Sequence, residues 1–522
     1  MEKILVLDFG GQYNQLIARR VREQHVYAEI RAGGKITADA KSKDGGLTLD
    51  EIRNGGYKGM IFTGGPNSVY ADGSPRCPTA VLDLGIPILG ICYGAQLIAY
   101  LAGGQVNPNE TVSEYGHTPF TVTAGSQLFT DIPEQSICWM SHGDSITELP
   151  YGFTTTAHSA GCPVAALENP ARGLFAVQFH PEVKNTEHGA QIFRNFLFNI
   201  CGCKGDWVLD DFVAHSIAQY RQELEGKRVL LALSGGVDSA VTAALLSRAI
   251  GSKLVCVFVD HGLMRKDEGD EIEQYFTQNF DLQFIRVNAR ERYLKRLKEV
   301  SEPERKRKII GEAFIRVFEE EAKKLGQINV LAQGTIYPDV IESGVGGAAV
   351  IKSHHNVGGL PEHLKFDSIL EPLRNLFKDE VRQIGLTLGL PKELVWRQPF
   401  PGPGLGIRCI GEVTWEKLEI VRKADAIFRD EVCRAGMEFE LSQYFAVVTD
   451  VQSVGVMGDS RSYDRMVALR SIDTDDFMTG NWSRVPYELL AKVSSRIINE
   501  VKGVNRVVYD ITSKPPGTVE WE

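Results

Sequence analysis

The stretch Gly90-Ile91-Cys92-Tyr93-Gly94 stands between an apolar run, Ile86–Ile91, and a helical pattern over Tyr93–Leu101. A short buried strand that turns sharply into a helix is the repeating unit of a parallel sheet covered by helices. Similar apolar runs, each followed by turn residues, recur along the first 200 residues at Ile4–Leu7, Gly59–Phe62 and Leu174–Phe179. The pattern therefore predicts an α/β fold in which functional side chains gather beyond the carboxyl ends of the strands.

Length and charge limit the class of protein. A chain of 522 residues exceeds what one hydrophobic core supports, and 43% hydrophobic and 24% charged residues are ordinary for a globular protein. The formal net charge of −10 argues against broad nucleic-acid binding, although the basic run Arg305–Lys308 could meet a phosphate. We expect several domains and no nucleic-acid partner.

The cysteines and the apolar segments indicate a cytoplasmic protein. Nine cysteines are scattered along the chain, which disfavours a disulfide framework. Residues 1–8 have the pattern of a strand rather than of a signal peptide, and no stretch reaches the roughly 18 apolar residues that span a bilayer. We expect a reducing compartment and no membrane partner.

Changes of pattern divide the chain into three predicted domains. The alternation of strands and helices restarts after Cys201-Gly202-Cys203, and the Pro-rich and Gly-rich run 398–404 interrupts it again. We predict two doubly wound, mainly parallel-sheet domains, residues 1–202 and 203–397, followed by a smaller α+β domain, residues 398–522.

Local composition predicts the elements of these domains. The segment Gly33–Gly56 is rich in Gly, Lys, Asp and Ser, and most of it is interpreted as a surface loop. The later strands are expected at Lys227–Leu233, Leu254–Val259, Phe284–Asn288, Val330–Ala332, Tyr444–Thr449, Arg465–Ser471 and Arg506–Ile511. Helices are expected near residues 414–435 and 486–501.

Three segments that each end a strand of the first domain suggest a catalytic site. Gly-x-Cys-x-Gly resembles a turn that presents a nucleophile, and the positive end of the following helix favours a thiolate on Cys92. His180 could act as its base and Glu182 could orient the imidazole, while the loop Thr63–Pro66 could offer N–H groups to an oxyanion. Each segment alone is more often structural, as a buried small hydrophobe or a capped turn. Their occurrence together favours catalysis.

A second glycine-rich turn, Ser234-Gly235-Gly236-Val237-Asp238-Ser239, follows a predicted strand and opens a helix. Such a turn is often only structural, but here two glycines permit close backbone approach, and two serine hydroxyls and the free N–H groups attract phosphate oxygens. Asp238 could bind Mg²⁺, and Asp260 ends the next strand, where adenosine contacts are expected. The Gly-Lys-Ser/Thr ending of a Walker A loop is absent, which disfavours γ-phosphoryl transfer. The pair His354-His355 lacks further ligands at suitable spacing, so zinc is not predicted there.

Residues 1–200 resemble the class I (triad) glutamine amidotransferases, whose hallmarks are Gly-Ile-Cys-Tyr-Gly-x-Gln and Phe-His-Pro-Glu. The resemblance implies that Cys92 attacks the side-chain amide of glutamine and releases ammonia. His180 would then move the proton and Glu182 would hold His180. Backbone amides for the oxyanion and a side chain that holds glutamine are implied at Gly65, Tyr93 and Gln96.

The glycine loop at 234–239 resembles that of the N-type ATP pyrophosphatases, which cleave ATP between the α and β phosphates. Over the whole chain the sequence resembles the glutamine-hydrolysing GMP synthetase family, through motifs at Lys306–Gly311, Lys352–Asn356, Leu376–Arg382, Pro399–Leu405 and Ser513–Glu522. The resemblance implies that xanthosine 5′-monophosphate (XMP) is adenylylated on its C2 oxygen. Ammonia then displaces AMP to leave GMP.

The same resemblance implies further site residues and partners. The motif positions expected to contact XMP are Arg307, Arg408, Lys514 and Glu520. Lys352 and Lys378 are candidates for stabilising charge during adenylyl transfer. Glutamine, XMP and ATP would be the substrates, with Mg²⁺ as cofactor, and the last domain would mediate homodimerisation.

Two other interpretations stay open at this point. NAD synthetases and tRNA-modifying pyrophosphatases share the Ser-Gly-Gly loop, but neither explains the Gly-x-Cys-x-Gly triad, and a tRNA enzyme needs a basic surface. A catalytically inactive nucleotide sensor is the remaining alternative. The intact set Cys92, His180, Glu182, Ser234 and Asp238 argues against it.

Overall fold

The computed structural model describes residues 1–38, 46–108, 113–123, 125–342, 366–457, 460–474 and 479–522. The chain forms two compact units, the first from Met1 to Val208 and the second from Leu209 to Glu522. The predicted fold class is confirmed, since α/β sheets occupy both units and an α+β region ends the second. Among the described helices, none is both long enough and apolar enough to cross a membrane.

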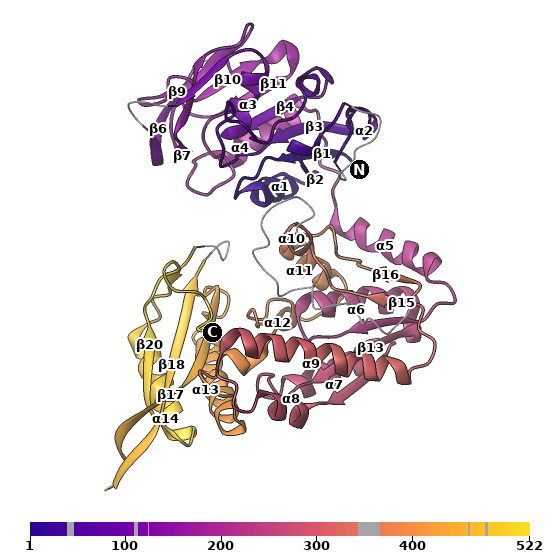
Figure 1. Ribbon diagram of the computed structural model, residues 1–522, viewed down its shortest axis with the longest axis vertical. Helices are drawn as coiled ribbons and strands as arrows, with labels where there is room; N and C mark the ends of the chain where they lie inside the picture. The colour runs from indigo at the N-terminus through magenta and orange to yellow at the C-terminus, as the bar shows by residue number, and fades with distance from the viewer. Residues whose placement is uncertain (39–45, 109–112, 124, 343–365, 458–459, 475–478) are drawn as a thin grey trace. The chain divides into compact units, whose positions relative to one another are not determined.

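The first unit is built on one mixed sheet of nine strands. Five neighbouring strands run parallel, and the other four are antiparallel (Figure 1). In sheet order they are β2 (Tyr27–Ala32), β1 (Lys3–Asp8), β3 (Tyr57–Phe62), β4 (Ile88–Ile91), β11 (Leu174–Val177), β10 (Ala166–Asn169), β9 (Thr154–Ser159), β6 (Glu114–Val122) and β7 (Gln135–His142). The predicted strands lie in the parallel half, while the antiparallel half was not anticipated. Strands β5 (Gln105–Pro108) and β8 (Asp144–Glu148) form a separate pair.

Helices of the first unit follow the parallel strands, as the alternating pattern predicts. They are α1 (Asn14–Glu23), α2 (Leu49–Asn54), α3 (Tyr93–Leu101) and α4 (Gly189–Arg194), which continues as a π-helical turn to Ile200. Helix α2 lies within residues 33–56, a segment of which much is predicted to be a surface loop. Thr48 accepts a hydrogen bond from the backbone N–H of Glu51, and the Glu51 carboxylate accepts one from the N–H of Thr48. This reciprocal capping box satisfies two otherwise unpaired N–H groups and starts the helix.

The second unit begins with a fully parallel sheet of five strands. Its order is β14 (Gln283–Asn288), β13 (Leu254–Asp260), β12 (Val229–Ala232), β15 (Val330–Ala332) and β16 (Ser368–Leu370). Around it stand α5 (Leu209–Glu223), α6 (Val237–Ile250), α7 (Glu268–Asn279), α8 (Arg290–Leu297), α9 (Pro303–Lys324), α10 (Tyr337–Glu342), α11 (Lys378–Thr387) and α12 (Lys392–Val395), most of them visible in Figure 1. Strand β13 is buried along its whole length, as expected of a parallel sheet covered on both faces.

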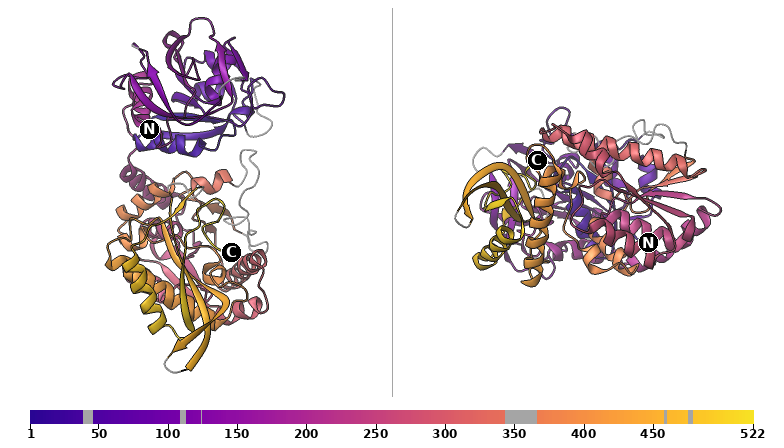
Figure 2. Two further views of the ribbon diagram at one scale, coloured as in Figure 1. Left: turned by 90° about the vertical axis from the view of Figure 1, so that its left-hand side faces the viewer. Right: turned by 90° about the horizontal axis from the view of Figure 1, so that it is seen from below.

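The C-terminal part of the second unit is a small sheet with two helices. Strands β17 (Gln443–Met457) and β18 (Ser460–Asp473) form a long antiparallel ribbon, which Figure 2 shows extending away from the rest of its sheet. β19 (Asn481–Trp482) and β20 (Val504–Asp510) both pair with β18. Helices α13 (Trp415–Arg434) and α14 (Tyr487–Glu500) contribute to an apolar core that also takes in side chains of β12 and β13.

Candidate active sites

The first site is centred on Cys92, which lies between β4 and α3. Its φ of 52° and ψ of −108° are unusual for a residue other than glycine, as expected of a strained turn that presents a side chain. A Cβ on Gly94 would lie 2.2 Å from the carbonyl oxygen of Phe62, and one on Gly90 would lie 2.6 Å from that of Gly94. Only glycine therefore fits at both flanking positions, which is why Gly-x-Cys-x-Gly forms this turn.

His180 and Glu182 form a buried pair just beyond the carboxyl end of β11. His180 Nδ1 lies 2.7 Å from Glu182 Oε1, and the Glu182 side chain is fully buried. Burial alone would lower the pKa of His180, but the charge of Glu182 and hydrogen bonds to Cys92 and Glu182 outweigh it and raise that pKa well above its usual value. The Tyr13 ring packs edge-on against the imidazole at 5.3 Å. The carboxylate thus supports a protonated imidazole beside the sulfur.

Gly64 marks the space that Cys92 and His180 share. A methyl group on Gly64 would lie 3.4 Å from His180 Cε1 and 3.8 Å from Cys92 Cβ. Next along the chain, a Cβ on Gly65 would meet the carbonyl oxygen of Phe9 at 2.8 Å, so the backbone passes too close for any other residue. The structure thus brings the predicted glycine loop, nucleophile and base together at the ends of β3, β4 and β11.

Gln96 lies on α3 one turn beyond Cys92, and its amide is bound by protein groups. Its Nε2 donates to the carbonyl oxygen of Asp144 at 3.0 Å and to Oε1 of Gln178 at 3.1 Å. The Gln178 amide in turn points to the Cys92 sulfur at 3.8 Å, which accepts from it. The Cys92 thiol faces the carbonyl oxygen of Ser141 at 3.7 Å. Sequence reasoning missed Gln178, Ser141 and Asp144, and the only signal was that Gln178 stands two residues before His180.

The second site is the loop 234–239, which joins β12 to α6. Gly235 has a φ of +81°, which glycine adopts without strain. Ser234 Oγ and Ser239 Oγ lie 3.1 Å apart, and the N–H of Gly236 donates to Ser234 Oγ at 3.3 Å. The loop thus wraps the positive end of a 14-residue helix in hydroxyl groups. Such an arrangement is suited to phosphate oxygens.

Asp238 and Lys378 form an ion pair at this loop. Lys378 Nζ donates to both carboxylate oxygens of Asp238, at 2.9 and 2.7 Å. Lys378 is the first residue of α11, so the structure brings together two candidates that are 140 residues apart. Arg397, which the sequence reasoning missed, donates to the carbonyl oxygen of Gly235. The other candidate for adenylyl transfer, Lys352, lies outside the described residues.

Asp260 ends β13 at the carboxyl edge of the sheet, as predicted. It is 3% exposed and accepts hydrogen bonds at 2.7 Å from both Arg286 and Arg290, and one at 3.2 Å from the N–H of Gly262. Burial would raise the pKa of its carboxyl, but the two arginines outweigh burial and lower it to about 2. Asp260 therefore remains ionised and binds the guanidinium groups of Arg286 and Arg290 at this edge of the sheet.

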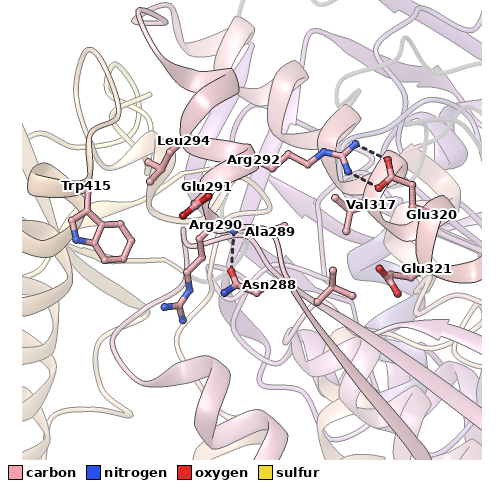
Figure 3. A pocket seen from close by; sticks show the side chains of 11 residues that line it. Asn288, Ala289, Arg290, Glu291, Arg292, Leu294, Val317, Glu320, Glu321 and Trp415 are labelled. Carbon is pink, nitrogen blue, oxygen red and sulfur yellow. Dashed lines mark hydrogen bonds and ion pairs between the residues drawn. The ribbon is translucent and has the colours of Figure 1, made fainter. Parts of the chain in front are cut away.

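Arg290 also lines the cavity of about 840 Å³ that Figure 3 shows between β14, α8, α9 and Trp415. Arg292 pairs there with Glu320 at 2.7 and 2.9 Å. Glu291 and Glu321 add further negative charge to the walls. Because its arginines are paired with carboxylates, this cavity is a poor site for a nucleotide phosphate.

The predicted XMP residues Arg408 and Glu520 meet in the C-terminal part of the second unit. Arg408 is fully buried and donates to Glu520 through Nε at 3.1 Å and through a terminal nitrogen at 2.8 Å. Its guanidinium also lies over the Phe445 ring, 4.0 Å from the centroid. Gln443 Nε2 donates to the same carboxylate at 3.2 Å. Glu520 borders a cavity of about 560 Å³ that Arg470 and Trp521 also line.

The last residues of the chain pack against α9. Arg307 donates to the carbonyl oxygen of Glu522, and the neighbouring Lys306 binds the Glu522 carboxylate and the carbonyl oxygen of Cys409. Lys306 is fully buried, whereas Arg305 and Lys308 are exposed, so the basic run 305–308 is only in part the solvated helix face that such runs usually form. Lys514 exchanges two backbone hydrogen bonds with Gly480 beside β19.

These two sites define a glutamine amidotransferase joined to a nucleotide-activating unit, and comparisons with known proteins agree. The model of "Glutamine amidotransferase class-I" matches residues 5–200, that of "NAD synthase" matches residues 210–313, and that of "GMP synthase C terminal domain" matches residues 430–521. A glutamine-hydrolysing GMP synthase of Ruminiclostridium cellulolyticum is 58% identical over 521 residues, covering 100% of this chain and 99% of that protein. One of Acetivibrio thermocellus is 57% identical with the same coverage. The chain belongs to the family of glutamine-hydrolysing GMP synthases, which are ligases.

Proposed function

We propose that this protein makes GMP from XMP, with glutamine as the nitrogen donor and ATP cleaved to AMP and pyrophosphate through an adenylyl-XMP intermediate. The observation that carries the proposal is the meeting of Cys92, His180 and Glu182 at one edge of the first sheet, in a chain 58% identical to its relatives from end to end. An inactive sensor would have no need of a buried carboxylate that keeps an imidazole charged beside a thiol.

In the first unit, the Cys92 sulfur attacks the side-chain carbonyl carbon of glutamine. His180 gives its proton to the departing nitrogen, so ammonia leaves and a glutamyl thioester remains on the sulfur. The N–H groups of Gly65 and Tyr93 stabilise the oxyanion, and Tyr93 N–H is the first of the helix N–H groups that lack a partner within α3. Water, activated by His180, then releases glutamate. Gln96 and Gln178 hold the walls of this pocket.

In the second unit, the loop 234–239 binds the pyrophosphate part of ATP. The XMP C2 oxygen attacks the α-phosphorus, pyrophosphate leaves, and ammonia displaces AMP from C2. Mg²⁺ bound to ATP would neutralise phosphate charge, and Asp238 fits such an ion because one carboxylate suffices when phosphates supply other ligands. Lys378, which forms an ion pair with Asp238, would move onto the phosphates when ATP binds.

Within the XMP site we assign Glu520 and Arg408 different roles. Glu520 lines the C-terminal cavity, so its carboxylate is the group that contacts substrate. Arg408 is fully buried behind it and holds that carboxylate in place. Arg307 and Lys514 supply charge for the XMP phosphate, and Asp260 with its arginines lies at the sheet edge that receives adenosine.

We also propose a cytoplasmic homodimer with the predicted three-domain division at residues 202 and 397. All nine cysteines are free, which fits a reducing compartment. The β17–β18 ribbon exposes Val454 at 54%, Val456 at 76% and Tyr463 at 62%, a row of apolar groups suited to a second copy. Replacing Val456 with Asp should give monomers by light scattering after size exclusion, and an unchanged mass would remove the ribbon from the interface.

The reaction is tested by its products. Incubation with glutamine, ATP and XMP should yield GMP, glutamate, AMP and pyrophosphate in equal amounts, with deamido-NAD and tRNA as competing acceptors that stay unchanged. Formation of ADP and phosphate, or AMP release only with another acceptor, would refute the assignment. The Cys92→Ala variant should lose glutamine-dependent synthesis and keep synthesis from added ammonium.

A further inference from the structure

A second group of chemically reactive side chains lies in the antiparallel half of the first sheet, outside the residues used above. Glu114 begins β6, and His142 ends β7 directly opposite it in the strand register. Cys162 follows β9, in a turn where its N–H donates to Ser159 Oγ at 2.9 Å. One ligand atom from each of the three residues can be chosen so that all lie within 4.8 Å of one another.

We propose that Glu114, His142 and Cys162 form a binding site for a zinc ion. Carboxylate, imidazole and thiolate are the three ligand types that zinc takes in proteins, and thiolate with imidazole selects it over Mg²⁺ or Ca²⁺. His142 Nε2 lies 3.6 Å from Glu114 Oε2, and ligand atoms on a tetrahedral zinc stand roughly 3.4–3.6 Å apart given its bond lengths. Bringing the sulfur to that spacing from at most 4.8 Å needs a shift of at most roughly 1.4 Å, within reach of a side-chain rotation.

The hydrogen bonds of His142 are those of a metal ligand. Its Nδ1 donates to the carbonyl oxygen of Asp144 at 2.9 Å, so the lone pair of a neutral ring lies on Nε2. That nitrogen is buried without a hydrogen-bond partner in the described structure, in a residue that is 4% exposed. A bare lone pair facing a carboxylate is unfavourable, and a cation between them removes the conflict. Metal-binding histidines characteristically donate their other ring nitrogen to a backbone carbonyl.

Hydrogen bonds also orient the side chains of Glu114 and Cys162. The Glu114 carboxylate accepts hydrogen bonds from Ser159 Oγ at 2.9 and 2.8 Å and from the N–H of Gly161 at 3.1 Å, which fix its orientation. The Cys162 thiol donates to the carbonyl oxygen of Val164 at 3.4 Å, and zinc would replace that proton, because zinc binds the thiolate.

The ion would act on the glutamine pocket through the residues 141–144. His142 is bonded to the carbonyl oxygen of Asp144, which also accepts from Gln96, and the neighbouring Ser141 carbonyl faces the Cys92 sulfur. Fixing the His142 ring therefore fixes two groups of that pocket. The role is structural, because the ligand set is buried away from the reacting sulfur.

The test uses the full-length protein with Cys92 replaced by Ala, so that the catalytic thiol binds no metal. After dialysis against Zn²⁺ and then buffer, elemental analysis should give about one zinc per chain. Co²⁺ in its place should give the absorption of a thiolate bound to cobalt. Cys162→Ser and His142→Gln should each lose the band and at least ten-fold in metal affinity. Cys138→Ser, a buried neighbour whose thiol donates to Thr118, should keep both.

Two results would overturn the site: no retained zinc and no cobalt band in the Cys92→Ala protein, or a band that survives Cys162→Ser but not Cys138→Ser. The first of these results needs no change at the proposed ligands, so a Cys162 or Cys138 variant that fails to fold does not decide the matter. A further readout depends on the proposed function. With Cys92 intact, removing zinc should raise KM for glutamine several-fold and leave ammonium-dependent synthesis unchanged, and failure of GMP synthesis from ammonium would count against the function, not the site.

Discussion

Replacing Glu182 with Gln tests the first site most directly, because it removes a charge and keeps the shape. The carboxylate is fully buried, 2.7 Å from His180 Nδ1, and its charge keeps the imidazole protonated against the effect of burial. The charge-assisted hydrogen bond is worth about 1.5–3 kcal/mol. A Gln amide can also donate to Nδ1, which puts the ring proton on the nitrogen that must serve the sulfur. Together we expect a loss of about 3–5 kcal/mol in transition-state stabilisation, or roughly 10²–10⁴-fold in kcat.

The assay follows glutamate release from glutamine and, separately, GMP formation from ammonium. Only the first should fall. Because Glu182 raises the pKa of His180, the limb of the pH–rate profile that His180 sets should move to lower pH in the variant. Glu187→Gln is a matched control, since that carboxylate accepts a hydrogen bond from the exposed backbone N–H of Ile137 and lies outside the set Cys92, His180 and Glu182. A loss below ten-fold, an unmoved limb, or equal loss of both activities would refute the reasoning.

Four other substitutions probe the two units. Gly64→Ala should reduce the rate of glutamine hydrolysis at least ten-fold without changing the thermal unfolding midpoint, because its methyl group lies at ordinary contact distance from His180 and fills substrate space. Gly94→Ala should lower the thermal unfolding midpoint by several degrees, since its Cβ would overlap backbone atoms. Asp260→Asn should lower the free energy of urea unfolding by about 2 kcal/mol at pH 7, because the pKa of Asp260 in the folded protein is about 2, below the usual 3.8. This stabilisation is present above about pH 4 and is lost as the pH falls toward 2. The unfolding free energies of the variant and the parent should therefore converge at low pH. Lys378→Met should reduce pyrophosphate release about 10²-fold and leave glutamate release unchanged; equal glutamate loss would contradict separate sites.

Most of the parallel strands could be predicted because they are short runs rich in apolar residues with glycine or polar residues at their ends. The edge strands β2 and β16 were not predicted, since β2 carries Glu29 and Arg31 and β16 has only three residues. The antiparallel strands β6 and β7 carry a different signal. Along β7 the buried positions include Ser136, Cys138 and His142, so the alternation of burial has no matching alternation of hydrophobicity. On β7, Ser136, Cys138 and His142 each hydrogen-bond a backbone carbonyl oxygen. On β6, the Glu114 carboxylate accepts from Ser159 and Gly161, partners that are distant in sequence.

The helix α2 shows an available signal that composition obscured. Thr48-Leu49-Asp50-Glu51 is a capping-box sequence, and the structure forms that box. The glycines and lysines before it suggested a loop, but a helix of six residues needs only its own cap and one buried side chain, Ile52. The capping-box sequence therefore predicts the start of α2 better than the average composition of the 24 residues 33–56 does.

The sites divide in the same way. The resemblance to family motifs indicates which residue type stands at which position, so Cys92, His180 and Glu182 could be predicted from the sequence alone. The resemblance carries no information on burial. Burial distinguishes side chains that can contact a ligand from side chains that hold those contacting side chains in place. Arg408 is fully enclosed while its partner Glu520 borders a cavity, although both were predicted as equivalent XMP contacts.

Burial also explains why Lys306 and Arg307, which are adjacent in one basic run, have different roles. On α9 consecutive side chains point about 100° apart, so one enters the core and the other remains near its surface. Lys306 is fully buried, and removing its charge would leave the Glu522 carboxylate buried without its cation. Lys306 therefore anchors the side-chain carboxylate of Glu522 to α9, two residues beyond Glu520.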